Sequence, residues 1–187
     1  MAKKAESTLK NMLLALTAIA LVAAAALAAL NAVTAAPIEA AQKAKVENAI
    51  SAVLPAFDHL EDQTVDGLAC HLGYNADGEM VGVAIEAGND KGFGGHIQLM
   101  VGFDVDGNVY GYQILETHET PGLGAKAADW FQKGAKGDII GKNPLSANLT
   151  VAKDGGEVDA ITGSTITSRA FLDIVRTAAD TFNKLNK

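Results

Sequence analysis

One apolar run constrains this chain more than any other feature of its sequence. Residues 12–30 are Leu, Ala, Ile, Val and Met apart from one polar residue, Thr17. The run is close to the ~20 residues with which an α-helix crosses a bilayer. It is also longer than the ~7–15 residues of a signal-peptide core, and a helix over it has no polar face for water. We therefore predict that residues 1–36 hold a retained transmembrane anchor in contact with membrane lipid; cleavage among the small residues 32–36 is the alternative.

Basic residues set the expected orientation of this anchor. Lys3, Lys4 and Lys10 precede the apolar run, and the positive-inside bias keeps such a segment in the cytoplasm. Two further lysines after the run are partly balanced by neighbouring glutamates. We expect a single-pass protein of the cytoplasmic (inner) membrane whose C-terminal domain is extracytoplasmic.

Composition excludes several classes of protein. A net charge of −7 disfavours a surface that grips nucleic acid. Cys70 is the single cysteine, which excludes an internal disulfide and a thiolate-held cluster. Asp104, Asp106 and Asn108 alternate like the start of a calcium loop but lack its later glycine and glutamate, so we interpret them as a turn. We expect no metal site and no catalytic acid–base set.

The rest of the chain predicts an α+β protein, in which helices cover an antiparallel sheet. Residues 37–60 are expected to form a stalk, with a helix from 37 to about 54 that ends before Pro55. Within residues 61–187, the Asp-Gly pairs at 66–67, 77–78 and 106–107 favour hairpin turns. Strands are expected at residues 68–74, 80–87, 97–103 and 109–115, with a glycine-rich loop at 88–95. Helices are expected at residues 126–132 and 167–185, the second with one apolar stripe.

A hydroxyl-rich segment opens the last of these helices. Residues 159–168 contain five serines and threonines and one glycine. One or two hydroxyls are explained by capping, because Ser and Thr accept hydrogen bonds from the first free N–H groups of a helix. The same N–H groups, with the positive end of the helix dipole, favour a phosphate. From the residues alone, a helix cap and a phosphate site both remain open.

The sequence Thr162-Gly163-Ser164-Thr165, preceded by Asp159, resembles the [Ser/Thr]-Gly-Ala-Thr signature of FMN-binding domains in bacterial ion-pumping redox complexes. The resemblance implies FMN joined to Thr165 by a phosphoester, attached by a separate flavin transferase that uses FAD. It places Thr162, Gly163, Ser164 and Thr167 at the cofactor. Ser164 stands where alanine is usual, so Thr162 and Thr167 are kept as alternative acceptors.

A second block, residues 92–102 and 118–124, makes the chain similar to the G subunits of Rnf-type electron-transport complexes, and less closely to the C subunit of the sodium-pumping NADH:quinone reductase. The resemblance implies contacts with the isoalloxazine ring or ribityl chain. The residues implied are Glu119, Thr120, Gly122 and Leu123. Two of them have ordinary alternatives, Leu123 as core and Glu119 as a solvated charge. Further candidate neighbours of the flavin are His118, Phe93, Tyr112 and Trp130.

The function implied by this resemblance is electron transfer. The chain is expected to be the electron-carrier subunit of a membrane ferredoxin:NAD oxidoreductase coupled to ion translocation, with the other subunits as partners. One apolar span without ionisable residues gives ions no path through this chain itself. The alternatives are the FMN subunit of a quinone reductase, a stand-alone flavoprotein, and a non-redox anchored binding or structural subunit.

Overall fold

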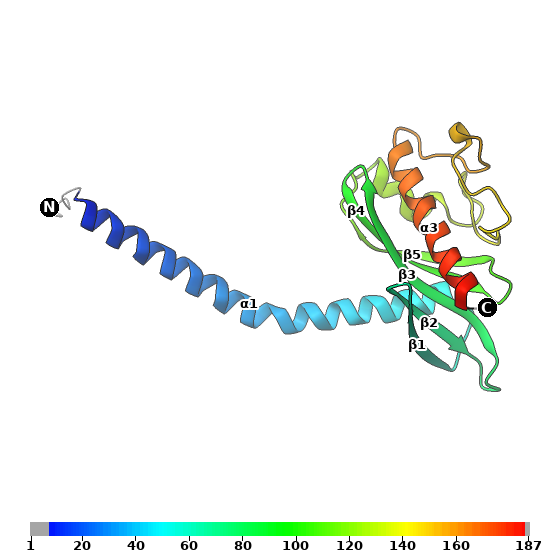
Figure 1. Cartoon of the computed structure of the whole chain (residues 1–187), viewed down its shortest axis with the longest axis horizontal. Helices are drawn as coiled ribbons and strands as arrows, with labels where there is room; N and C mark the ends of the chain where they lie inside the picture. The colour runs from blue at the N-terminus through cyan, green and yellow to red at the C-terminus, as the bar shows by residue number, and fades with distance from the viewer. Residues whose placement is uncertain (1–7, 186–187) are drawn as a thin grey trace. The chain divides into compact units, whose positions relative to one another are not determined.

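The computed structural model describes residues 8–185 (Figure 1), and the chain divides into two units after Ala44. The described part of the first unit belongs to helix α1 (Leu9–Val53), whose large apolar side chains there are exposed. By length and composition α1 is able to cross a membrane. Lys3 and Lys4, on which the expected orientation partly depends, lie outside the described residues.

Helix α1 joins the segments that we expected to be separate, an anchor up to residue 36 and a stalk after it. Pro37 lies inside the helix, where it removes one backbone hydrogen bond without ending the helix. The helix stops at Val53, just before Pro55, and a strand has already begun at His59. The expected stalk, residues 37–60, therefore holds the end of one helix and the start of the sheet.

The second unit is built on five antiparallel strands in the order β1-β2-β3-β4-β5. The sequence pattern predicted four, because β1 has polar residues at most positions and is exposed along almost its whole length. The expected loop at 88–95 is also wrong, since β3 and β4 run on as a long hairpin closed by Phe93 and Gly94. The strands are β1 (His59–Val65), β2 (Leu68–Tyr74), β3 (Met80–Gly92), β4 (Gly95–Asp104) and β5 (Val109–Thr117).

Successive residues of the strands face opposite sides of the sheet and enter different apolar clusters. In β4, Leu99 and Val101 belong to the larger cluster, whereas Met100 belongs to the smaller one. The smaller cluster also contains the last turn of α1, including Val53. A Cβ atom on Gly102 would overlap the Val53 carbonyl oxygen. Glycine at that position therefore allows the end of α1 to rest on the sheet.

Helix α3 (Thr165–Leu185) covers the other face of the sheet (Figure 1) and supplies much of the larger cluster. Its apolar stripe is buried as predicted, and Phe171 packs on Phe131 and Tyr112 with ring centroids 4.4 and 4.8 Å apart. The helix begins two residues earlier than expected. The expected helix at 126–132 is a 3₁₀ turn η1 (Gly124–Lys126) followed by α2 (Ala127–Trp130). Most of residues 131–164 is irregular, with one further 3₁₀ turn, η2 (Ala152–Asp154).

The acidic residues 104–108 form the turn that the sequence predicts, and Cys70 lies in the core. The Cys70 thiol is fully buried, and burial raises its pKa above the ordinary value. Asp104 accepts hydrogen bonds from the N–H groups of Asp106 and Asn108, at 3.0 and 2.9 Å, which is the pattern of a turn. Among residues 8–185, no group of three His, Cys, Asp or Glu side chains is placed to hold a metal ion.

Candidate functional site

A buried serine organises the start of α3. The Ser168 hydroxyl accepts the Ile161 N–H at 2.9 Å and donates to the Ser164 carbonyl oxygen at 3.0 Å. Gly163, with φ of 78°, allows the left-handed turn between these residues. The helical hydrogen bond from the Ser168 N–H to the Ser164 oxygen is 3.0 Å long. The three N–H groups before it, at residues 165–167, lie at the positive end of the helix without an intrahelical acceptor.

The hydroxyls of this segment have different surroundings. Thr162 is exposed, whereas Ser164 is 8% exposed. Thr165 is half-buried and faces a cavity. Thr167 is fully buried, and its hydroxyl has no hydrogen-bond partner among the described residues. The capping explanation therefore accounts for Ser168, which ties the turn together, but it does not account for Thr165 or Thr167.

The cavity beside Thr165 has a volume of about 360 Å³, within the range of small-molecule sites. Four separate segments form its walls: the β3–β4 hairpin tip, the turn at 119–124, the η2 turn and the start of α3. The structure thus brings together the two blocks that the sequence motifs indicated. The lining residues are Phe93, Glu119, Thr120, Leu123, Gly124, Lys153, Gly163, Ser164, Thr165 and Ile166. Thr162, Gly122 and Thr167 of the expected set are not among them.

Glu119 is the buried acidic group of this site. Only 8% of the residue is exposed, and its carboxylate accepts the Gly94 N–H at 3.2 Å. A Cβ atom on Gly124 would lie closer than 3.0 Å to both Glu119 Oε2 and Thr167 Oγ1. The carboxylate thus occupies space that Gly124 leaves free and connects the turn at 119–124 to the β3–β4 hairpin tip. The alternative of a solvated loop charge at Glu119 is wrong.

Three large apolar side chains are exposed among the lining residues. Phe93 is 71% exposed, Leu123 45% and Ile166 50%. Each comes from a different wall. The alternative of Leu123 as a core residue is therefore wrong. A flat apolar ring in the cavity would cover side chains that otherwise remain in water.

The other aromatic candidates are structural. The Tyr112 hydroxyl donates to the Ala127 carbonyl oxygen at 2.7 Å, and burial strongly raises the pKa of this tyrosine. The Trp130 indole donates to the Asp159 oxygen at 2.8 Å. His118 is exposed, lies 3.2 Å from the Glu116 carboxylate and does not line the cavity. Of these candidates only Phe93 reaches the site.

Three lining residues, Gly124, Lys153 and Ile166, were not predicted as site residues from the sequence. Ile166 follows Thr165 directly, so the motif itself could have included it. Lys153 lies in η2, twelve positions before Thr165, in an irregular segment that returns to the helix start. It is the one basic residue among the lining side chains. No periodicity or spacing in the sequence indicates that contact.

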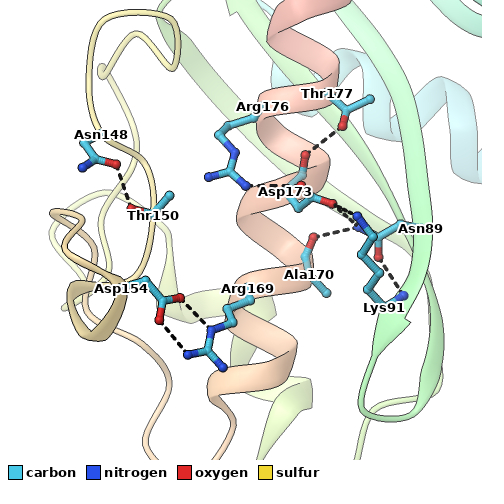
Figure 2. A network of polar contacts seen from close by, with 10 residues as sticks. All are labelled: Asn89, Lys91, Asn148, Thr150, Asp154, Arg169, Ala170, Asp173, Arg176 and Thr177. Carbon is cyan, nitrogen blue, oxygen red and sulfur yellow. Dashed lines mark hydrogen bonds and ion pairs between the residues drawn. The ribbon is translucent and has the colours of Figure 1, made fainter.

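A second cleft, of about 420 Å³, lies along the following turns of α3. Figure 2 shows its charged side chains paired with one another. Arg169 makes two hydrogen bonds of 2.7 Å to Asp154, and Asp173 lies 2.7 Å from Lys91 and 3.2 Å from Arg176. The hydrogen bond from Arg169 holds the pKa of Asp154 below its usual value, and that from Lys91 does the same for the pKa of Asp173.

The chemistry of the first cavity fits a flavin nucleotide. Free N–H groups at a helix start and one lysine suit a phosphate, and three apolar side chains suit a ring system. The carboxylate of Glu119 and the hydroxyl of Thr120 suit the hydroxyl groups of a ribityl chain. The buried, unpartnered Thr167 hydroxyl beside Gly124 is a further polar group at this end of the helix.

Residues 92–180 match the family model of the FMN-binding domain. This segment contains both the turn at 119–124 and the start of α3. Residues 92–180 therefore resemble an FMN-binding domain; β4, β5 and most of α3 lie in this segment, whereas β1 and β2 lie outside it.

Relatives of known name narrow this class further. The chain is 42% identical over 106 residues to the G subunit of the ion-translocating oxidoreductase complex of Escherichia coli K12, over 54% of this chain and 50% of the relative. It is 34% identical over 112 residues to the G subunit of the Na⁺-translocating ferredoxin:NAD⁺ oxidoreductase complex of Acetobacterium woodii, over 60% and 54%. The chain thus spans about half the length of these relatives. The predicted resemblance to the G subunits is confirmed.

Proposed function

We propose that this protein is the electron-carrier subunit of a membrane ferredoxin:NAD oxidoreductase coupled to ion translocation, with FMN joined by a phosphoester to Thr165. One observation carries the proposal. Within a matched FMN-binding domain, Thr165 is the threonine at the helix start that lines the cavity. The relatives named as G subunits of ion-translocating complexes support the assignment to such a complex.

Burial favours Thr165 over the other two threonines as the acceptor. Thr162 lies outside the cavity, and a flavin attached there would leave the apolar side chains uncovered. Thr167 is fully buried, so its oxygen offers no approach to an enzyme that carries the donor. Ser164, the departure from the usual signature, is 8% exposed, which disfavours its modification in place of Thr165.

Attachment needs a donor and an enzyme, because a threonine hydroxyl is too weakly acidic to react unaided. In the proposed reaction a flavin transferase supplies FAD. The Thr165 oxygen forms a bond to the FMN phosphorus, the pyrophosphate bond breaks, and AMP leaves while the hydroxyl proton passes to a base. The chain contributes the orientation of its hydroxyl, which the Ser168 hydrogen bonds fix at the helix start.

Bound FMN supplies one-electron chemistry that no side chain of this protein provides. The chain itself holds and shields the cofactor. The first N–H groups of α3 would hold its phosphate, Glu119 would accept hydrogen bonds from its polar part, and Phe93, Leu123 and Ile166 would exclude water from its ring. A covalent link also prevents loss of the flavin into the extracytoplasmic compartment in which we place this domain.

The remaining subunits of the complex are the expected redox partners. Helix α1 holds the protein at the inner membrane and in contact with lipid, with its N-terminus in the cytoplasm as the lysines before it favour. Ion passage belongs to other subunits, because residues 12–30 contain no ionisable side chain. The alternatives are the FMN subunit of a quinone reductase, a stand-alone flavoprotein and a non-redox anchored subunit; co-purifying subunits separate the first two from our proposal.

The test is attachment in cells that contain the flavin transferase. After denaturing electrophoresis the full chain is expected to fluoresce under ultraviolet light, and mass spectrometry is expected to find one FMN on the peptide with Thr165. Thr165→Ala should abolish the band completely. Thr177→Ala is the matched control, since Thr177 is an exposed threonine of the same helix. A dark wild-type band, or a bright Thr165→Ala band, would contradict covalent attachment at this residue.

A further inference from the structure

We infer that Lys153 neutralises the negative charge of the link at Thr165, and that the Asp154–Arg169 ion pair is the device that places it there. This inference rests on the proposed function and deepens it. It assigns the phosphate end of the cavity to a residue outside both sequence blocks, and it gives a role to an ion pair that lies in the neighbouring cleft.

The charge of the link requires a partner. A phosphodiester keeps one negative charge at all physiological pH values, and the helix start offers it only about half of a positive charge. Lys153 is the one basic side chain that lines the cavity, and the acidic Glu119 lines it too. Without Lys153, only about half a positive charge at the helix start would face the two negative charges of the link and Glu119.

Other basic side chains near this end of α3 are engaged elsewhere. Lys91 and Arg176 lie 2.7 and 3.2 Å from the carboxylate of Asp173 in the second cleft. Arg169 uses two guanidinium nitrogens on Asp154. These three residues line the second cleft and not the cavity of Thr165. Lys153 is therefore the basic side chain that is left to balance the charge of the link.

Backbone contacts fasten the turn that carries Lys153 to the segment that follows it. The Ala152 N–H donates to the Val158 oxygen at 2.8 Å, and Val151 and Val158 form a parallel bridge. A Cβ atom on Gly156 would overlap the Thr150 carbonyl oxygen, so only glycine lets the two backbone segments on either side of the turn lie this close together. Lys153 is thus attached to a fixed backbone, although its side chain is exposed.

One ion pair relates this turn to the attachment point. Arg169 lies four residues after Thr165, one turn along the same helix. Its two hydrogen bonds to Asp154 hold the residue next to Lys153 (Figure 2). The helix that presents the acceptor hydroxyl therefore also fixes the turn that presents the counter-charge. Lys153 is a binding residue in this arrangement, and Asp154 with Arg169 are positioning residues.

The first experiment measures how fast the full-length apoprotein, in detergent, gains fluorescence with purified flavin transferase and FAD. Lys153→Gln is expected to slow attachment about fivefold, the effect of losing one exposed charge pair, and Lys153→Arg to restore most of the rate. Lys136→Gln, at an exposed lysine outside both cavities, is the control. Equal rates for Lys153→Gln and Lys136→Gln would overturn the role of Lys153.

A second measurement separates binding of the link from recognition by the transferase. On fully loaded protein, the ³¹P resonance of the phosphodiester is expected to shift in Lys153→Gln and to stay in place in Lys136→Gln. An unchanged ³¹P resonance in Lys153→Gln would overturn the proposal that Lys153 balances the charge of the phosphodiester.

The positioning role has its own test. Arg169→Gln should slow attachment about as much as Lys153→Gln if it acts through the lysine, and the double variant should be no slower than either. Additive losses would overturn the positioning role. If wild-type protein gains no flavin at Thr165, the proposed function itself fails, which is a separate outcome.

Discussion

The cavity beside Thr165 and the second cleft both lie along α3, but their charged side chains are arranged differently. In the cleft of Figure 2, Asp154 and Asp173 are paired with Arg169, Arg176 and Lys91. In the cavity at the start of α3, Glu119 accepts one backbone hydrogen bond from Gly94, and the Thr167 hydroxyl, buried behind the lining residue Gly124, has no partner among the described residues. Side chains that satisfy one another fasten elements together, whereas buried groups left with spare bonding capacity point to a ligand. This contrast supports the cavity at the start of α3 as the cofactor site that we propose.

One apolar layer lies beneath both hollows and supports the helix that they share. Phe171→Ala should therefore destabilise the protein most, by about 3–5 kcal/mol, because Phe171 is fully buried between Phe131 and Tyr112. Chemical unfolding of the full chain in detergent, followed by tryptophan fluorescence, measures this loss. A change below about 1 kcal/mol would mean that α3 is held mainly by its charged contacts and not by the core.

Gly124→Ala should affect the cavity alone. The new methyl group would collide with the Glu119 carboxylate and the Thr167 hydroxyl, and overpacking of this kind costs about 1–3 kcal/mol. Attached flavin should decrease in yield, while the second cleft keeps its ion pairs. Covalent flavin per protein, from absorbance after denaturation, gives the measurement. Undiminished flavin would show that the carboxylate can move without consequence for the site.

Asp173→Asn should give the smallest effect and leave flavin attachment unchanged. Hydrogen bonding from Lys91 lowers the pKa of Asp173 in the folded protein. Its contribution to stability is therefore present above the ordinary aspartate pKa of about 4 and is lost as the pH falls through the lowered value. Thermal melts between about pH 2 and 7 should show a shallower loss on the acid side for Asp173→Asn than for the wild type. If the melting temperatures of Asp173→Asn and the wild type fall equally steeply with acid, Asp173 does not contribute to the pH dependence of stability.

The features that could be predicted from the sequence are local or contiguous. Thr165 and the turn at Glu119 lie in short motifs, and the stripe containing Phe171 follows helical spacing. Strand β1 was missed because its residues are exposed and carry no alternation of apolar and polar side chains. The glycines before Phe93 predicted a loop, although tertiary pairing with β4 makes them strand.

The missed parts of the site are long-range. Lys153 lines the same cavity as Thr165 only because an irregular segment folds back along α3, and the burial of Glu119 depends on glycines at positions 92 and 124. An irregular segment has no periodic pattern of apolar and polar residues, so the sequence around Lys153 does not indicate which residues lie near it in space. Contacts of this kind require the structure.

The order of the strands along the chain determines which part of the domain is able to form first. Each strand pairs with the one made just before it, so the sheet can assemble while the chain is still being synthesised. The wall that carries Thr165 is different, because it belongs to a 21-residue helix at the C-terminal end that packs back onto β3. The cavity forms only after α3 has been synthesised and has docked on the sheet. A chain that stopped after β5 would carry the sheet but not Thr165, the attachment point that we propose.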